Sequence, residues 1–119
     1  MPTVLSESTL AGLRELQGSD TEFMKHLISI YLENLDSWMP KLEAARASKD
    51  FKTIAQGCHQ LKSSSRNLGA EGFGIYLENC EMLAKASDPK VIDAIGPEFA
   101  KHKHAVVQAL QSLPEWSSG

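Results

Sequence analysis

Residues 51–69 read Phe51-Lys-Thr-Ile-Ala-Gln-Gly-Cys-His-Gln-Leu-Lys-Ser-Ser-Ser-Arg-Asn-Leu-Gly69, and apolar or small residues recur along them at steps of three and four. This spacing is the period of an α-helix with one buried face. The positions on that face are Phe51, Ile54, Ala55, Cys58, Leu61, Ser65 and Leu68. Gly69 suits the position just after a helix, where the backbone is often left-handed. We therefore predict an amphipathic helix from about residue 51 to residue 68.

A single imidazole lies beside the apolar stripe of this helix. At about 100° per residue, His59 falls about 110° from the centre of the stripe, so it lies at the edge of the buried face or outside it. Lys62 and Ser63 follow three and four residues later and share its side of the helix. An exposed neutral imidazole offers a nucleophilic nitrogen near neutral pH, and a lysine can hold phosphate oxygens as a point charge. These residue types favour phosphoryl chemistry, with small Ser63 leaving room for a second protein.

The chain before this helix also has helical periodicity. A short helix is predicted over residues 7–17, with Leu10, Leu13 and Leu16 on one side. Ser19-Asp-Thr-Glu22 matches a capping box, a strong start signal for a second, long helix. Its predicted buried positions are Phe23, Leu27, Ile30, Tyr31, Leu35, Trp38, Leu42 and Ala45. Pro40 lies inside it, so we expect a kink or a short break there.

The chain after Gly69 continues in the same way. A helix is predicted over residues 71–86, and a last one from Ser87-Asp-Pro89 to Leu113 that Gly96-Pro97 divides into two pieces. No sustained period-two alternation predicts a strand. The short connections favour antiparallel neighbours, which gives an all-α, up-down antiparallel four-helix bundle with an additional short N-terminal helix covering one end. We expect one domain over residues 1–119, with its core at about 8–113 and a frayed, flexible tail at 114–119.

The amino-acid composition restricts the kinds of partner that this protein could bind. The formal net charge is −3, which argues against nucleic acid. Residues 49–66 are the exception, with four basic side chains and one acidic one, so an acidic protein surface would be attracted there. No signal peptide and no apolar stretch of membrane-spanning length are visible. Cys58 and Cys80 fall on predicted core positions and fit buried thiols in a reducing cytoplasm.

The segment His59-Gln-Leu-Lys-Ser-Ser-Ser-Arg-Asn-Leu-Gly-Ala70 resembles the signature of histidine-containing phosphotransfer (HPt) domains, H-x-L-K-G-S-S-x-x-L-G-A. Every fixed position matches except one, where Ser63 stands in place of glycine. The resemblance covers roughly residues 8–113, because the other predicted helices fall where that family has its bundle helices. It implies a monomeric, cytoplasmic phosphorelay intermediate that carries phosphate between aspartates of response-regulator receiver domains, with a hybrid sensor histidine kinase as a further partner.

The resemblance also implies roles for individual residues. His59 would accept the phosphoryl group on Nε2, and Lys62 would steady its oxygens. Glu81, with Glu78 one turn earlier, occupies the place of a polar residue that orients the histidine. Ser63, Arg66 and Gln56 would meet the partner. The chain would need no cofactor of its own, since the receiver supplies Mg²⁺, and it carries no nucleotide-binding motif, so it would not phosphorylate itself from ATP.

Two alternatives remain beside this interpretation. Ser63 at the glycine position favours an HPt-like binding module that docks a receiver or kinase with little or no transfer. A metal or cofactor protein is disfavoured, because His102 and His104 lie two residues apart and point to different sides of a helix. Facing Glu-x-x-His pairs, as in di-iron bundles, are absent from the sequence.

Overall fold

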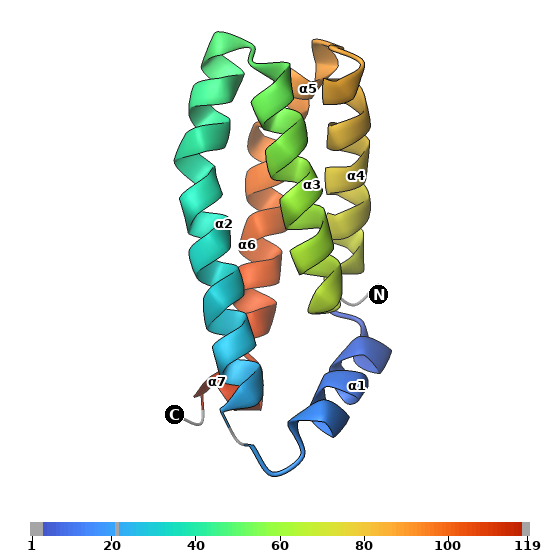
Figure 1. Ribbon diagram of the computed structural model, residues 1–119, viewed down its shortest axis with the longest axis vertical. Coiled ribbons are helices and arrows are strands. Elements are labelled where there is room, and N and C mark those ends of the chain that lie inside the picture. Colours follow the sequence, from blue (N-terminus) through green and yellow to red (C-terminus); the bar gives the residue numbers. More distant parts are fainter. Residues whose placement is uncertain (1–3, 21, 118–119) are drawn as a thin grey trace.

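The computed structural model describes residues 4–20 and 22–117, and every regular element in this part of the chain is a helix. The helices are α1 (Glu7–Gln17), α2 (Phe23–Ser48), α3 (Phe51–Asn67), α4 (Glu71–Lys85), α5 (Lys90–Ala94), α6 (Pro97–Gln111) and α7 (Pro114–Ser117). The predicted all-α class is therefore confirmed. Helices α2, α3, α4 and α6 run alternately up and down and form a bundle, with α1 at its lower end and α5 at its upper end (Figure 1).

Helix α2 contributes the longest buried stripe. Its buried residues are Met24, Ile28, Tyr31, Leu35, Trp38, Leu42 and Ala45, which alternate steps of four and three. The second half of this stripe was predicted, but the first half was placed one position too early: Ile30 is half exposed. Apolar residues occur in adjacent pairs at the start of α2, so periodicity alone does not fix which member faces the core. The helix continues through Pro40 without a break.

The predicted capping box at the start of α2 is wrong. The helix begins at Phe23 with Glu22 as its N-cap residue, whereas a capping box would place Glu22 inside the first turn. The carboxylate of Asp20 accepts a hydrogen bond from the Glu22 amide (3.1 Å), and the Gln17 side chain accepts one from the Met24 amide (3.2 Å). Local side-chain hydrogen bonds from the preceding turn therefore satisfy the start of the helix.

Helices α2 and α3 pack closely. The hydroxyl groups of Tyr31 and fully buried Ser65 lie 2.8 Å apart in a hydrogen bond between the two helices. Burial raises the pKa of Tyr31 to about 12, although the hydrogen bond with Ser65 opposes this change. Gly57, two residues before His59, faces α2 so tightly that a Cβ there would lie 2.9 Å from both Leu42 Cδ2 and Trp38 Cε3.

The end of α3 anchors the N-terminal helix. Gly69 has a φ of +87°, which confirms the predicted left-handed glycine after α3. Its carbonyl accepts a hydrogen bond from the Ser6 amide (2.7 Å), and a Cβ on Gly69 would lie 3.0 Å from the same Ser6 nitrogen. Leu5 and Leu10 are buried beside this junction, so α1 covers the lower end of the bundle as expected.

The C-terminal segment is divided into two helices as predicted, but its last described residues differ from the prediction. Gly96 separates α5 from α6, and Pro97 is the first residue of α6. Instead of fraying from residue 114 onward, residues 114–117 form α7, which packs against α2. The Arg14 guanidinium binds both carboxylate oxygens of Glu115 at 2.8 and 3.3 Å, which ties α1 to α7. Pro114 starts this turn, and the part of the predicted tail at residues 118–119 lies outside the described residues.

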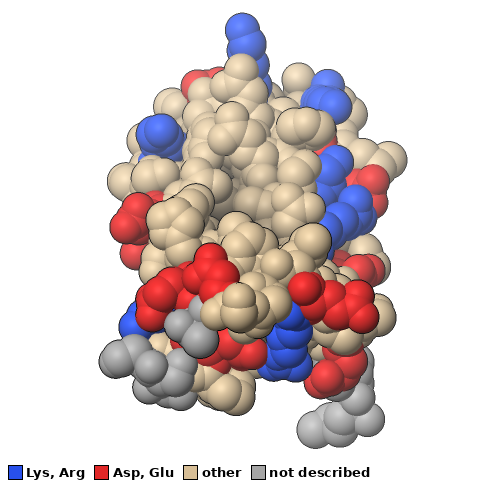
Figure 2. Space-filling view, turned by 60° about the horizontal axis from the view of Figure 1, so that its bottom comes forward, with Lys and Arg blue, Asp and Glu red and all other residues tan. Residues whose placement is uncertain are grey.

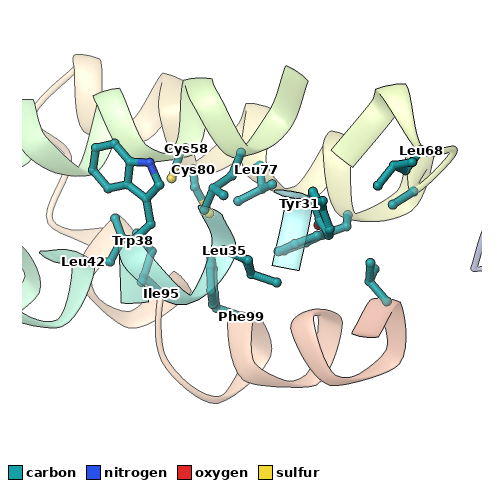
Figure 3. Packing of buried hydrophobic residues seen from close by; sticks show 14 of the residues in the cluster. Tyr31, Leu35, Trp38, Leu42, Cys58, Leu68, Leu77, Cys80, Ile95 and Phe99 are labelled. Carbon is teal, nitrogen blue, oxygen red and sulfur yellow. The ribbon is translucent and has the colours of Figure 1, made fainter. Parts of the chain in front are cut away.

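The core lies between the four long helices. Figure 3 shows Leu35 and Trp38 of α2 near Cys58 of α3 and Cys80 of α4, with Ile95 and Phe99 on the other side and Tyr31 further along α2. Both cysteines are buried and free, as predicted. Half-buried His102 stacks on the ring of Tyr76, with centroids 4.5 Å apart.

Charge is unevenly distributed over the surface. Figure 2 turns the lower end of the bundle forward and shows acidic side chains gathered there. Glu7, Glu15, Asp20 and Glu22 belong to α1 and the segment that follows it, at this end. The basic segment 49–66 instead forms the turn into α3 and α3 itself. Among the described residues, no helix is long and apolar enough to cross a membrane.

Candidate functional site

The imidazole of His59 projects from the middle of α3 into solvent. The neighbouring Cys58 and Leu61 are fully buried, whereas 61% of the His59 side chain is exposed. This is the placement predicted from its offset to the apolar stripe. Its ring is held by Glu81 on α4, since Nδ1 lies 3.0 Å from Oε2 of that residue.

Glu81 is a buried carboxylate that three nitrogen atoms contact. Its side chain is only 5% exposed. Oε2 lies 3.0 Å from His59 Nδ1 and 2.9 Å from Lys85 Nζ, and Oε1 accepts a hydrogen bond of 2.8 Å from Lys62 Nζ. His59 and Lys62 come from successive turns of α3, whereas Glu81 and Lys85 come from successive turns of α4. The site is thus built across the α3–α4 interface.

The electrostatics of the site keep Glu81 ionised. Burial alone would raise the pKa of this carboxyl, but hydrogen bonds from Lys62, Lys85 and His59 outweigh burial and lower the pKa to about 2. An ionised carboxylate only accepts hydrogen bonds, so His59 Nδ1 must be the donor in their contact. The neutral ring then has its proton on Nδ1, and the lone pair of Nε2 is available to a reacting group.

The two lysines differ in their surroundings. The Lys62 side chain is 16% exposed, whereas that of Lys85 is 67% exposed. A groove of about 720 Å³ runs beside His59 between α3 and α4. Its lining includes His59, Glu81 and Lys85, together with Lys52 and the apolar side chains of Phe51, Ala55 and Ala84, but it does not include Lys62. Lys85 therefore faces the open space next to the imidazole, whereas Lys62 contacts the other carboxylate oxygen outside the groove lining.

The residues predicted to meet a partner surround the imidazole. Gln56 is exposed one turn before His59 and lines the groove, and Ser63 is exposed one turn after it. Arg66 lies one turn further along α3, where its guanidinium binds Glu78 Oε2 at 3.0 Å. Glu78 is thus engaged by Arg66, and Glu81 is the acidic residue of α4 that contacts His59.

Two residues of this region were not identified from the sequence. Lys85 was overlooked, although its spacing of four residues from Glu81 is the usual one for an ion pair on a helix. Gln60 follows His59 and lines the same groove. Its side-chain oxygen accepts a hydrogen bond of 3.3 Å from the indole nitrogen of Trp38, which links the groove to the core.

Other chemistry has little support around these residues. Ser64 donates its hydroxyl hydrogen bond to the carbonyl of Gln60 (3.1 Å), and Ser65 bonds with Tyr31, so both serines contribute to helix packing. Within residues 4–20 and 22–117, no group of three or more His, Cys, Asp or Glu side chains is arranged to hold a metal ion. His26 and His104 are exposed on other helices.

Comparison with known protein families gives a match, and it covers the segment that contains this site. The family model of the Hpt domain matches residues 26–116, a segment that includes α3, α4 and all four residues of the His59–Glu81 cluster. Comparisons with curated proteins and with solved structures gave no significant match. Because the family model covers well over half of the chain, the chain belongs to the Hpt domain family.

Proposed function

We propose that this protein is a phosphorelay intermediate that accepts a phosphoryl group on His59 from a receiver-domain aspartate and passes it to the aspartate of another receiver. Membership of the Hpt domain family supports histidine phosphotransfer in general. The observation that carries the specific proposal is the contact of His59 Nδ1 with the ionised Glu81, because it leaves Nε2 exposed as a nucleophile.

The transfer follows from this arrangement. Nε2 attacks the phosphorus atom of the aspartyl phosphate, the new N–P bond forms, and the bond from phosphorus to the aspartate oxygen breaks. The aspartate leaves as a carboxylate, and the imidazole proton remains on Nδ1, where Glu81 accepts its hydrogen bond. The second transfer reverses these steps on another receiver. Such reactions depend mainly on alignment and on neutralisation of charge, which a rigid bundle helix with a fixed imidazole can supply.

We assign Glu81 as the residue that positions His59. We assign Lys62 as a fixed positive charge that stabilises the phosphoryl group. Ser63, Arg66 and Gln56 form the contact surface around the imidazole. The proposed partners are response-regulator receiver domains and a hybrid sensor histidine kinase, with Mg²⁺ bound by the receiver. We expect a monomer that works in the cytoplasm, a reducing compartment that suits its two free, buried thiols.

The test is transfer of phosphate from a phosphorylated receiver to the purified protein. We expect wild type to acquire acid-labile, base-stable phosphate and His59→Gln to acquire none. His26→Gln, which removes an exposed histidine of α2, is the matched control and should be labelled like wild type. Labelling of His59→Gln would refute the assignment.

The same assay decides between transfer and simple binding. Ser63 replaces a glycine at an exposed position one turn from His59, so its hydroxymethyl group adds bulk where a receiver approaches. If wild type and Ser63→Gly both bind a receiver but neither acquires phosphate, the protein is a docking module. Faster labelling of Ser63→Gly than of wild type would show that Ser63 tunes the rate of a functional transfer site.

A further inference from the structure

The two lysines that bind Glu81 are not equivalent. Lys62 is mostly buried, contacts Oε1 of Glu81, and does not belong to the lining of the groove. Lys85 is mostly exposed, lines the groove, and contacts Oε2, the same oxygen that accepts from His59 Nδ1. The ammonium of Lys85 is therefore a direct neighbour of the imidazole on the solvent side.

We propose that Lys85 is the cation that binds the phosphoryl group directly, by moving from Glu81 to the phosphoryl oxygens once His59 is phosphorylated. This inference rests on the proposed function and assigns different roles to Lys62 and Lys85 within it. Lys62 holds Glu81 in place in both states, so that the carboxylate continues to orient the imidazole. Lys85 changes partner, and no covalent bond of its own forms or breaks.

Charge balance favours this exchange. In the unphosphorylated site, one carboxylate binds two ammonium groups, so these three groups together carry a net charge of +1. A phosphoryl group brings close to two negative charges at neutral pH. The carboxylate keeps Lys62 and the Nδ1 proton, whereas the phosphoryl oxygens have no fixed partner until a cation reaches them. A lysine side chain has a long flexible stem, and the high exposure of Lys85 leaves it room to turn.

The experiment phosphorylates the protein without a receiver. Phosphoramidate donates its phosphoryl group to histidine as its P–N bond breaks and ammonia leaves. The ³¹P signal of the phosphohistidine is then followed against pH in wild type, Lys85→Met and Lys85→Arg. A nearby cation favours the more highly charged phosphoryl form, so we expect the midpoint in Lys85→Met to lie about half a pH unit higher, the size of one exposed charge pair. Lys85→Arg should stay close to wild type.

Lys52→Met is the matched control, since Lys52 is a second lysine in the lining of the same groove but belongs to α3. Its midpoint should match that of wild type. A midpoint in Lys85→Met equal to that of wild type, or an equal shift in Lys52→Met, would overturn the role of Lys85 while leaving phosphotransfer through His59 intact. If wild type is not phosphorylated on His59 by phosphoramidate or by a receiver, the proposed function fails and this inference fails with it.

Discussion

Replacing Glu81 with glutamine tests the physical basis of the site, because it removes the charge that holds three side chains together. The ordinary pKa of this carboxyl, 4.5, falls to about 2 in the folded protein. Each pKa unit corresponds to about 1.4 kcal/mol, so the ionised carboxylate, after the opposing effect of burial, contributes at most about 3.5 kcal/mol. His59 and Lys85 are well exposed and solvent screens their contribution, so we expect Glu81→Gln to lower the free energy of unfolding by about 2 kcal/mol at pH 7.

The pH dependence has a definite sign. A carboxyl whose pKa is lower in the folded state stabilises the protein fully above its unfolded pKa, and this stabilisation is lost as pH falls through the folded pKa. The difference between wild type and Glu81→Gln should therefore be full at pH 7 and shrink as pH falls from about 4.5 toward 2. Urea unfolding followed by circular dichroism at several pH values measures both quantities.

Glu78→Gln is the matched control on the same helix. Its ion pair with Arg66 is exposed on both sides, so its loss should cost about 0.5 kcal/mol or less. Equal losses in Glu78→Gln and Glu81→Gln at pH 7 would refute the reasoning. So would a loss in Glu81→Gln that stays constant from pH 7 to pH 2.5, because a pH-independent loss arises from packing and not from charge.

Two other substitutions test the α2–α3 interface by the same unfolding assay. Gly57→Ala should destabilise by about 1–2 kcal/mol, since a clash with the Trp38 ring outweighs the gain in helix propensity; Gly12→Ala in α1, where a Cβ meets nothing within 4 Å, should instead stabilise by up to about 1 kcal/mol. A stabilised Gly57→Ala would show that the interface can relax. Tyr31→Phe should cost about 1–2 kcal/mol, because the buried Ser65 hydroxyl loses its partner across the helices, and a loss below about 0.3 kcal/mol would contradict that role.

Sequence periodicity predicts most of this fold because each long helix buries one stripe. The prediction is weakest where two apolar residues are adjacent, as at the start of α2, because either phase of the stripe then buries an apolar side chain. The start of α2 at Phe23, with Glu22 as its N-cap, goes with a hydrogen bond that the Glu22 amide donates to the Asp20 carboxylate, an arrangement that competes with a capping box. The turn at Pro114 is too short to show any periodicity.

The candidate site, like the fold, could be predicted from the sequence only in part. His59 and Lys62 could be related from sequence, since their spacing within one helix determines that they share a side. The contact of His59 with Glu81 depends on how α3 and α4 are aligned, and a single sequence does not specify the alignment of two helices. The family resemblance therefore offered Glu81 with Glu78 beside it, and the structure places Glu81 against the imidazole. The burial of Glu81 has no periodic signal in the sequence, because periodicity predicts buried apolar side chains and not buried acidic ones.

The hydrogen bond between Trp38 and Gln60 gives this protein a built-in optical probe. The chain has two tryptophans, and Trp116→Phe leaves Trp38 as the sole one. Trp38 is 8% exposed, and its indole N–H donates a hydrogen bond to a side chain that lines the groove beside His59. Indole emission depends on such hydrogen bonds and on contact with water. A partner that displaces Gln60 as it docks would change the fluorescence without any added dye, so binding and phosphotransfer could be timed separately in one stopped-flow experiment.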